Sequence, residues 1–315
     1  MLKKISIIGG GQIGGTIAHL ASLKNLGNVV ILDNKGSFAR GKALDISQAN
    51  HIFGIDCKIL GTDRYEDISN SDVVIVTAGL PRKPGMSRDD LIQTNYNIIK
   101  DVAANVKKYS PNAFVVVITN PLDAMVYAFQ KISEIPSSMV IGMAGVLDTS
   151  RFCHFLSEAF NVSKKEINAM VLGGHGDTMV PVLGSSFVSG VSVPEFAKKS
   201  SISTEEIEKI VQRTRNGGAE IVELLGNGSA YYAPATAAIA MTESFLFNQK
   251  RILPCAAKLS GEYGVNDLYI GVPVVIGENG CEKVIEVNLS ESEASMLKSS
   301  VDAVKSLKEI VDSFD

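Results

Sequence analysis

The sequence predicts an α/β fold in two parts: a doubly wound parallel sheet comes first, and an α+β half follows it. Short, mostly β-branched apolar runs alternate with amphipathic stretches in the first half, as buried parallel strands alternate with crossover helices. The pattern changes near residue 145, after which longer runs and a hairpin signal appear. A chain of 315 residues is long enough for two domains, which we place at 1–145 and 146–315.

Apolar runs predict the strands of the first half. The clear ones are Ile5–Ile8, Val29–Leu32, Val73–Thr77, Phe114–Thr119 and Met139–Ile141. The third strand is less distinct, and Cys57–Leu60 is the candidate for it. Apolar residues at helical spacing predict helices over Ile13–Leu23 and Leu91–Lys108. Strand–helix–strand alternation of this kind favours a parallel sheet covered by helices.

The second half reads as helices followed by antiparallel strands. Helical patterns cover Thr149–Phe160 and Thr204–Leu225, and the strand candidates are Ile252–Leu259, Leu268–Ile276 and Cys281–Val287. The last two strands are joined through Glu278-Asn279-Gly280, in which Asn-Gly favours a tight hairpin. Ser290 and Glu293 have the spacing of a capping box that opens the final helix. The apolar face predicted for that helix is Ala294, Leu297, Val301, Val304, Leu307 and Val311.

Composition excludes several classes of partner. Hydrophobic residues make up 45% and charged residues 20%, which is ordinary for a globular protein with a core. Lys and Arg number 30 against 34 Asp and Glu, and a net charge of −4 gives no reason to expect nucleic acid or an anionic membrane. No apolar run approaches the length of a membrane span. Four cysteines without CxxC spacing predict no metal site and a reducing, cytoplasmic setting: Cys57, Cys153, Cys255 and Cys281.

A glycine-rich turn follows the first strand and opens the first helix. In this GxGxxG, Gly9 permits the tight turn, Gly11 lets a pyrophosphate approach the backbone, and Gly14 lets helix and strand pack closely. Asp33 ends the second strand 19 residues past Gly14, where a carboxylate can accept the ribose 2′-hydroxyl and repel a 2′-phosphate. This predicts a Rossmann-type domain that prefers NAD to NADP, although Lys35 nearby leaves NADP open. The alternative is an ordinary glycine turn with a surface Asp.

A cationic loop follows the strand that ends near Thr77. It carries Arg82, Lys83 and Arg88 among two prolines and two glycines, which exclude regular structure. Open α/β sheets bind ligands beyond the carboxyl ends of their strands. We interpret the loop as a lid that brings guanidinium groups to an anionic substrate and excludes water. A solvated basic loop is the alternative.

Three further residues complete a constellation. Asp148 and Arg151 lie three apart at the start of a helix, and His175 lies among glycines after an apolar run. Alone, each has a plainer interpretation as a cap, an ordinary ion pair or a turn residue. The other histidines, His19, His51 and His154, lie on predicted helices. Together, a His that exchanges a proton, an Asp that orients it and an Arg that holds a carboxylate describe reversible oxidation of a 2-hydroxy acid.

Six motifs give the sequence a clear resemblance. They are GGGQIG at 9–14, Asp33, TAGLPRKPGMSRDDL at 77–91, ITNPLD at 118–123, GVLDTSRF at 145–152 and GGHGDTMVP at 173–181. In this combination and order the sequence resembles the lactate/malate dehydrogenase family, most closely its lactate-dehydrogenase-like malate dehydrogenases. The elements predicted beyond 181 also suit the family, so the resemblance covers the whole chain.

The resemblance implies a role for each matching residue. His175 would be the proton donor and acceptor paired with Asp148, Arg151 would clamp the substrate's C1 carboxylate, and Arg88 would polarise the reacting carbonyl. Asn120 would hydrogen-bond the substrate near the nicotinamide. The residues implied to contact NAD are Gly9, Gly10, Gly11, Gln12, Ile13, Gly14, Asp33, Thr77, Ala78, Gly79, Asn95, Ile118, Thr119 and Asn120.

Arg82 bears on the choice of substrate. In family members that act on malate this position is an Arg that binds the second carboxylate, whereas lactate dehydrogenases typically have Gln there. The resemblance therefore implies a small dicarboxylate substrate, malate or oxaloacetate. The alternatives are lactate dehydrogenase, or a catalytically silent NAD-binding protein. Family members form dimers or tetramers, and we expect a homo-oligomer to which Leu44–Phe53 could contribute an interface.

Overall fold

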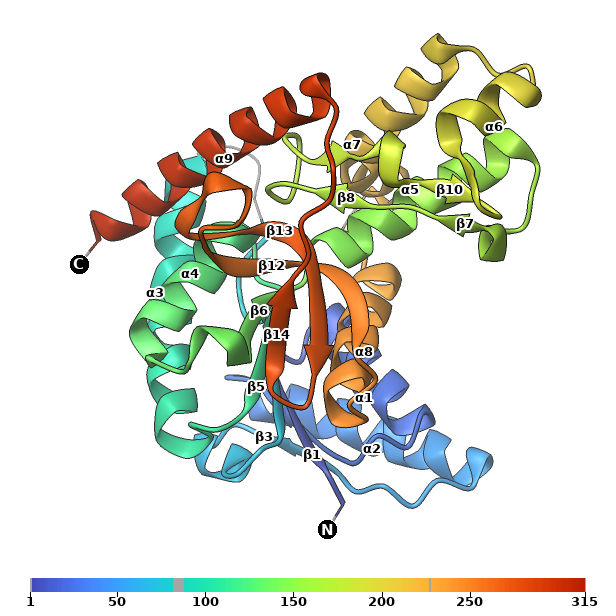
Figure 1. Ribbon diagram of the computed structural model, residues 1–315. Helices are drawn as coiled ribbons and strands as arrows, with labels where there is room; N and C mark the ends of the chain where they lie inside the picture. The colour runs from blue at the N-terminus through green and yellow to red at the C-terminus, as the bar shows by residue number, and fades with distance from the viewer. Residues whose placement is uncertain (1, 82–87, 227, 315) are drawn as a thin grey trace.

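A computed structural model of the chain describes residues 2–81, 88–226 and 228–314, without the side chains of Arg88 and Asp89. Within these ranges the main feature is a sheet of nine strands in the order β14-β13-β12-β6-β5-β4-β1-β2-β3 (Figure 1). Its strands are β1 (Lys4–Ile8), β2 (Asn28–Leu32), β3 (Ile59–Thr62), β4 (Val73–Val76), β5 (Phe114–Val117), β6 (Val140–Gly142), β12 (Arg251–Ser260), β13 (Asn266–Gly277) and β14 (Gly280–Val284).

The six strands from β1 to β6 are parallel and covered on both faces, which confirms the doubly wound sheet. Ile7 of β1 packs into the core cluster on one face, and the next residue, Ile8, packs into the cluster on the other. Helices α1, α2 and α8 lie together on one side of the sheet, and α3, α4 and α9 lie on the other (Figure 1). Their bounds are α1 (Gln12–Leu23), α2 (Gly36–Phe53), α8 (Tyr232–Leu246), α3 (Arg88–Tyr109), α4 (Leu122–Ser133) and α9 (Glu291–Asp312).

The order of the parallel strands indicates the edge of the sheet at which a ligand would bind. Chain order runs outward from β1 in one direction through β2 and β3, and in the other through β4, β5 and β6. The connections that leave β1 and β4 therefore diverge to opposite faces of the sheet. Open α/β sheets bind ligands in the crevice at such a switch point, beyond the carboxyl ends of the strands.

The three antiparallel strands expected in the second half are present, but they continue the parallel sheet. Ala256 of β12 pairs antiparallel with Gly142 of β6. A Cβ added at Gly142 would lie 2.9 Å from the Ala256 Cβ, so the glycine permits this close approach. The Asn279-Gly280 hairpin between β13 and β14 is confirmed, with Gly280 at a φ of +82°.

Several element boundaries differ from the sequence prediction, and two of the differences bear on packing and on the site. The third strand is Ile59–Thr62 and not Cys57–Leu60, because its parallel register with β2 runs on through Gly61 to Thr62. A Cβ added at Gly61 would lie 2.3 Å from the Ala39 carbonyl oxygen, so this glycine belongs to close helix–sheet packing. Helix α5 begins at Gly145, four residues before the predicted start at Thr149, which places Asp148 inside its first turn.

The rest of the second half packs around α5 (Gly145–Phe160), α6 (Val193–Lys199) and α7 (Thr204–Leu225). Two small sheets accompany these helices: β7 (Ile167–Asn168), β10 (Phe187–Val188) and β11 (Val191–Ser192) form one, and β8 (Val171–Leu172) and β9 (Val180–Pro181) form the other. Among the described residues, none of the helices is both long and apolar enough to cross a membrane.

The capping box at Ser290 and Glu293 is confirmed at the start of α9. The predicted apolar face of this helix is right except for Ala294, which is exposed. The preceding residue, Glu293, is buried in place of Ala294, because its carboxylate accepts hydrogen bonds from the backbone amides of Ser290 and Leu183.

Candidate active site

The glycine turn between β1 and α1 has the geometry that its sequence predicts. Gly9 has a φ of +108°, and a Cβ added at Gly14 would lie 1.9 Å from the Gly9 carbonyl oxygen, so helix and turn pack too closely for a side chain there. A Cβ at Gly11 would have open space within 4 Å among the described atoms. Within the described residues, no side chain caps the N-terminus of α1, and its first turn contains no acidic residue. The first amides of α1 are therefore available to bind an anion.

Asp33 lies beside this turn, just after β2. Its Oδ2 accepts a hydrogen bond from the Gly10 amide at 2.7 Å, and its Oδ1 accepts one from the Lys35 amide at 2.9 Å. The carboxylate is half-buried and keeps lone pairs for a ribose hydroxyl. An open glycine turn, free helix amides and an adjacent carboxylate together fit the pyrophosphate and ribose of NAD. Gln12 and Ile13 are the first residues of α1 and lie at the same turn.

The loops after β4 and β5 meet at the same edge. Thr77 donates from Oγ1 to the Gly9 carbonyl at 2.9 Å, and a Cβ added at Gly79 would lie 2.5 Å from Thr119 Cγ2. Thr119 itself donates to the Ala78 carbonyl oxygen at 2.7 Å. The structure thus brings together the predicted cofactor residues of three loops, those after β1, β4 and β5.

The side chain of Asn95 in α3 forms hydrogen bonds with the loops after β4 and β5. Its side-chain oxygen accepts from the Leu80 amide at 2.8 Å, and its side-chain nitrogen donates to the Asn120 carbonyl at 2.7 Å and to the Leu80 carbonyl at 3.1 Å. With 1% of its surface exposed and both N–H groups engaged, Asn95 positions the backbone of the loops after β4 and β5. Its direct contact with the cofactor stays a prediction. Asn120 is exposed beside it, and Ile118, just before Thr119, is buried.

His175, which follows β8, lies against Asp148 and Arg151 of α5. Asp148 Oδ2 lies 2.9 Å from His175 Nδ1, and Asp148 Oδ1 accepts from Arg151 Nη1 at 3.2 Å. Asp148 is 2% exposed, so one buried carboxylate holds both the imidazole and the guanidinium. The Nδ1 atom is thereby committed to Asp148, and Nε2 is the atom left to exchange a proton with a substrate.

The electrostatics favour a protonated imidazole. Burial acts to lower the pKa of His175, but the charge of Asp148, its hydrogen bond and the charge of Asp123 outweigh burial and raise this pKa above its ordinary value. Burial lowers the pKa of Arg151, and Asp148 opposes that shift. A raised pKa favours the protonated ring, which is the form that a general acid for carbonyl reduction needs.

Arg151 is packed against a glycine pair that the sequence analysis did not single out. A Cβ added at Gly217 of α7 would lie 3.1 Å from Arg151 Cδ, and one at Gly218 would lie 3.6 Å from its Nη2. Two adjacent glycines inside a 22-residue amphipathic helix cost helix propensity, so this pair was the available signal. Arg151 Nε is buried without a hydrogen-bond partner among the described residues, and a substrate carboxylate is a fitting acceptor for it.

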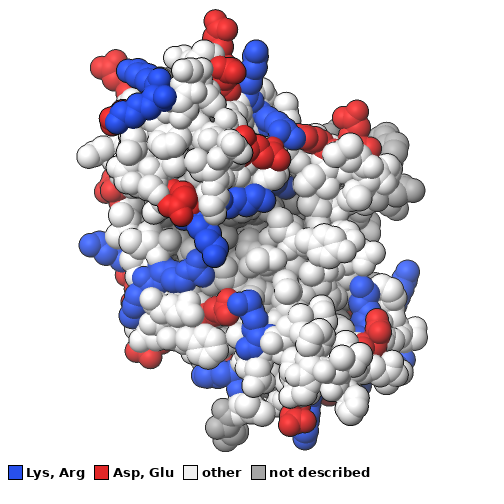
Figure 2. Space-filling model, turned by 90° about the vertical axis from the view of Figure 1, so that its right-hand side faces the viewer, with Lys and Arg blue, Asp and Glu red and all other residues white. Residues whose placement is uncertain are grey.

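Two predicted substrate residues cannot be placed in the same way. Arg82 lies outside the described residues, and so does the side chain of Arg88, whose backbone begins α3. On the face of the molecule in Figure 2, Lys and Arg side chains border a hollow, and acidic side chains are interspersed elsewhere. No cluster of His, Cys, Asp and Glu suited to a metal ion occurs within the described ranges.

Comparison with known families gives matches over almost the whole chain. Residues 3–142 match the family model described as the lactate/malate dehydrogenase NAD binding domain. Residues 145–314 match the lactate/malate dehydrogenase alpha/beta C-terminal domain. The cofactor of the first of these domains is NAD, in agreement with the turn and the carboxylate described above.

Solved structures of both activities resemble the chain. The malate dehydrogenase of Cryptosporidium parvum is 49% identical, with a TM-score of 0.97 over 99% of this chain and 100% of that one. The lactate dehydrogenase of the same organism, complexed with lactic acid and nicotinamide adenine dinucleotide, is 46% identical, with a TM-score of 0.96 over 99% and 98%. The lactate dehydrogenase of Eimeria maxima with NADH and oxamate is 42% identical, with a TM-score of 0.96 over 99% and 95%. With both halves matched and these identities across its length, the chain is an NAD-binding oxidoreductase that belongs to the lactate/malate dehydrogenase family.

Proposed function

We propose that the protein is an NAD-dependent malate dehydrogenase (EC 1.1.1.37) that interconverts malate and oxaloacetate. The observation that carries this choice of substrate is Arg82, in a loop that also contains Arg88. Pyruvate has one carboxylate, for which Arg151 suffices, whereas oxaloacetate has a second that needs another cation. An Arg enclosed with a substrate that offers it no partner costs binding about 2–5 kcal/mol, which disfavours pyruvate.

The proposed mechanism assigns one task to each side chain. Arg151 binds the C1 carboxylate and Arg82 the second one, while Arg88 polarises the carbonyl at C2. NAD supplies the hydride carrier when it is bound along the cleft. His175 gives a proton from Nε2 to the carbonyl oxygen during reduction and takes it back during oxidation, while Asp148 stabilises the imidazolium. The lid that the sequence predicts at 78–89 would exclude water from the site, and residues 82–87 of it lie outside the described part of the chain.

A comparison of two oxo acids tests the proposal. Purified protein is assayed for kcat/KM with oxaloacetate and with pyruvate, each with NADH and with NADPH. We expect oxaloacetate with NADH to be preferred by about 100-fold or more over pyruvate, as a lost charge pair requires. Equal or better use of pyruvate would identify a lactate dehydrogenase, the second candidate that the 46% identical lactate dehydrogenase favours. Absence of turnover with both acids, despite NADH binding, would identify a catalytically silent NAD-binding protein.

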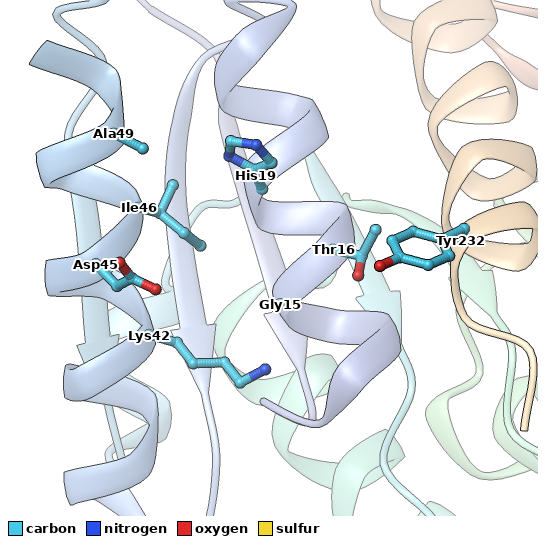
Figure 3. A pocket seen from close by; sticks show the side chains of 8 residues that line it. All are labelled: Gly15, Thr16, His19, Lys42, Asp45, Ile46, Ala49 and Tyr232. Atoms are coloured by element: carbon cyan, nitrogen blue, oxygen red, sulfur yellow. The ribbon is translucent and has the colours of Figure 1, made fainter. Parts of the chain in front are cut away.

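We also propose a homo-oligomer, because an apolar surface lies on the side of α1, α2 and α8. Exposed large side chains there include Phe38, Leu44, Ile52, Phe53 and Tyr232. Beside them a groove of about 430 Å³ runs between α1 and α2, with Tyr232 of α8 at its rim (Figure 3). Large apolar side chains that gather in the open on one side of a protein are typical of a subunit contact. Light scattering after gel filtration would give the stoichiometry, and Ile52→Glu should shift it towards monomer.

A cytoplasmic location completes the proposal. All four cysteines, Cys57, Cys153, Cys255 and Cys281, are free thiols in the structure, as a reducing compartment requires. Fractionation of the source cells, with activity followed in each fraction, tests this location.

A further inference from the structure

Three successive backbone amides hold the loop that carries His175. The amides of residues 173, 174 and 175 donate to acceptors on three different elements, β13, α9 and α4. The acceptors are, in order, Gly271 O at 2.9 Å, Ser300 Oγ at 2.8 Å and Asp123 Oδ2 at 2.9 Å. Of these three acceptors only the carboxylate of Asp123 can carry a charge, and it serves the amide of His175 itself.

Asp123 is an unusual acceptor for an ordinary loop anchor. It is the second residue of α4, only 3% exposed, and its Oδ1 is buried with no hydrogen-bond partner in the described part of the chain. A buried carboxylate that is satisfied on one side only is costly, although the start of a helix favours its negative charge. An Asn would have the same shape and could accept the same hydrogen bond. The charge is therefore the feature that needs a role.

The charged groups around His175 show which residue the Asp123 charge acts on. Asp148 of α5 faces the ring at Nδ1, and Asp123 of α4 faces the backbone of the same residue. Both carboxylates raise the pKa of His175, and the charge of Arg151 lowers it. Ser300 and Val304 of α9 and Thr178 also lie against this loop and are uncharged, and the charged side chain of Asp177 in the loop itself is exposed. Burial raises the pKa of Asp123 to about 6, so the group is mainly ionised at neutral pH.

We propose that Asp123 is a second positioning carboxylate for His175, which fixes the backbone of residue 175 and shares with Asp148 the negative charge that stabilises the imidazolium. The inference rests on the proposed role of His175 as the proton donor. It adds that α4, whose start follows the Asn120 loop directly, ties the proton donor to the cofactor half of the molecule. Asp123 acts only through His175 and has no assigned contact with substrate.

The direct test is an NMR titration of the His175 ring in the intact protein without substrate. The chain has four histidines, so the His175 signal is identified by its loss in His175→Asn. We expect Asp123→Asn to lower the titration midpoint of His175 by about 0.5 to 1 unit, because one of two facing negative charges is removed. Ser300→Ala is the matched control, since it removes the neighbouring anchor without a change of charge. It should leave the midpoint where it is in the unmodified protein.

Two results would overturn the proposal. One is an unchanged midpoint in a folded Asp123→Asn protein, and the other is an equal shift in both variants, which would mean that loop geometry alone matters. If Asp123→Asn does not fold, the residue-175 amide of the His175→Asn protein is followed against pH. We expect a single titration step from the Asp123 carboxyl that accepts from this amide, and a flat profile would also overturn the proposal.

Kinetics connect the shift to catalysis and keep the two hypotheses separable. With whichever oxo acid the protein prefers, Asp123→Asn should lower kcat with little change in KM. The alkaline limb of its kcat/KM profile, which reports the protein without bound oxo acid, should move to lower pH by the amount seen in NMR, because reduction needs the protonated ring. If the unmodified protein reduces no oxo acid, the proposed function fails while the NMR result can still stand. If it is active and the limb does not move, the role of Asp123 alone is wrong.

Discussion

His175 Nδ1 and Asp148 Oδ2 lie 2.9 Å apart, across a separation of 27 residues along the chain. Asp148 is in the first turn of α5 and His175 follows β8, so the contact joins two elements of the second half. The other oxygen of the same carboxylate accepts from Arg151. One buried group therefore fixes the distance between the proton donor and the cation that we propose for the substrate carboxylate, which is the relation that hydride transfer at C2 demands.

Removal of the Asp148 charge should weaken reduction and shift its pH dependence. The Asp148 carboxylate raises the pKa of His175, so Asp148→Asn should lower that pKa and leave less imidazolium at neutral pH. We expect kcat for oxaloacetate reduction to fall by about 100-fold or more, with its alkaline limb at lower pH. Malate oxidation needs the neutral ring, so its acidic limb should also move to lower pH. A pH profile with unmoved limbs would contradict the pairing.

Arg82 should decide between the two oxo acids. In Arg82→Gln we expect kcat/KM for oxaloacetate to fall by about 100-fold or more, because the second carboxylate loses a charged partner. Activity on pyruvate should fall little or rise. Lys83→Gln is the matched control, as it removes a neighbouring cation from the same loop and should have a small effect on both substrates. Equal losses for both acids in Arg82→Gln would refute the role in specificity.

Two substitutions in the glycine turn between β1 and α1 should affect NADH binding in different ways. Gly14→Ala places a methyl group 1.9 Å from the Gly9 carbonyl oxygen, so the turn must move and the protein should lose stability and NADH binding together. Gly11→Ala meets open space, so the fold should survive while the affinity for NADH falls where the pyrophosphate approaches. Thermal unfolding and NADH fluorescence titration separate the two outcomes. Unweakened NADH binding by Gly11→Ala would be evidence against this turn as the pyrophosphate site.

The features that could be predicted from the sequence are those with a short-range signal. Buried parallel strands and the capping box at Ser290 depend on periodicity or on neighbours in the chain, and the structure confirms them. The glycine turn also follows from local sterics, and the close packing predicted at Gly14 is confirmed.

The features that were missed depend on partners far away in sequence. The predicted third strand, Cys57–Leu60, stops before Gly61, yet Gly61 lies inside β3, where its lack of a side chain permits close contact with Ala39 of α2. Ala294 fits the apolar period of α9, but Glu293 takes the buried place because the Leu183 amide needs an acceptor. Asp123 lies 52 residues from the amide that it serves. No window along the chain contains both members of such pairs.

The glycine pair of α7 offers a last prediction, because it separates packing against Arg151 from helix stability. Gly217→Ala puts a methyl group 3.1 Å from Arg151 Cδ, which must shift by a few tenths of an ångström, whereas Gly218→Ala makes ordinary contact at 3.6 Å with Nη2. Both changes favour the helix by about 1 kcal/mol, so neither should lower the unfolding temperature by much. We expect Gly217→Ala to raise KM for the oxo acid by about 3- to 10-fold, since the guanidinium is displaced from the substrate carboxylate. Gly218→Ala should leave KM nearly unchanged. Steady-state kinetics of the two variants would decide, and a larger effect from Gly218→Ala would show that the packing of Arg151 is not what these glycines serve.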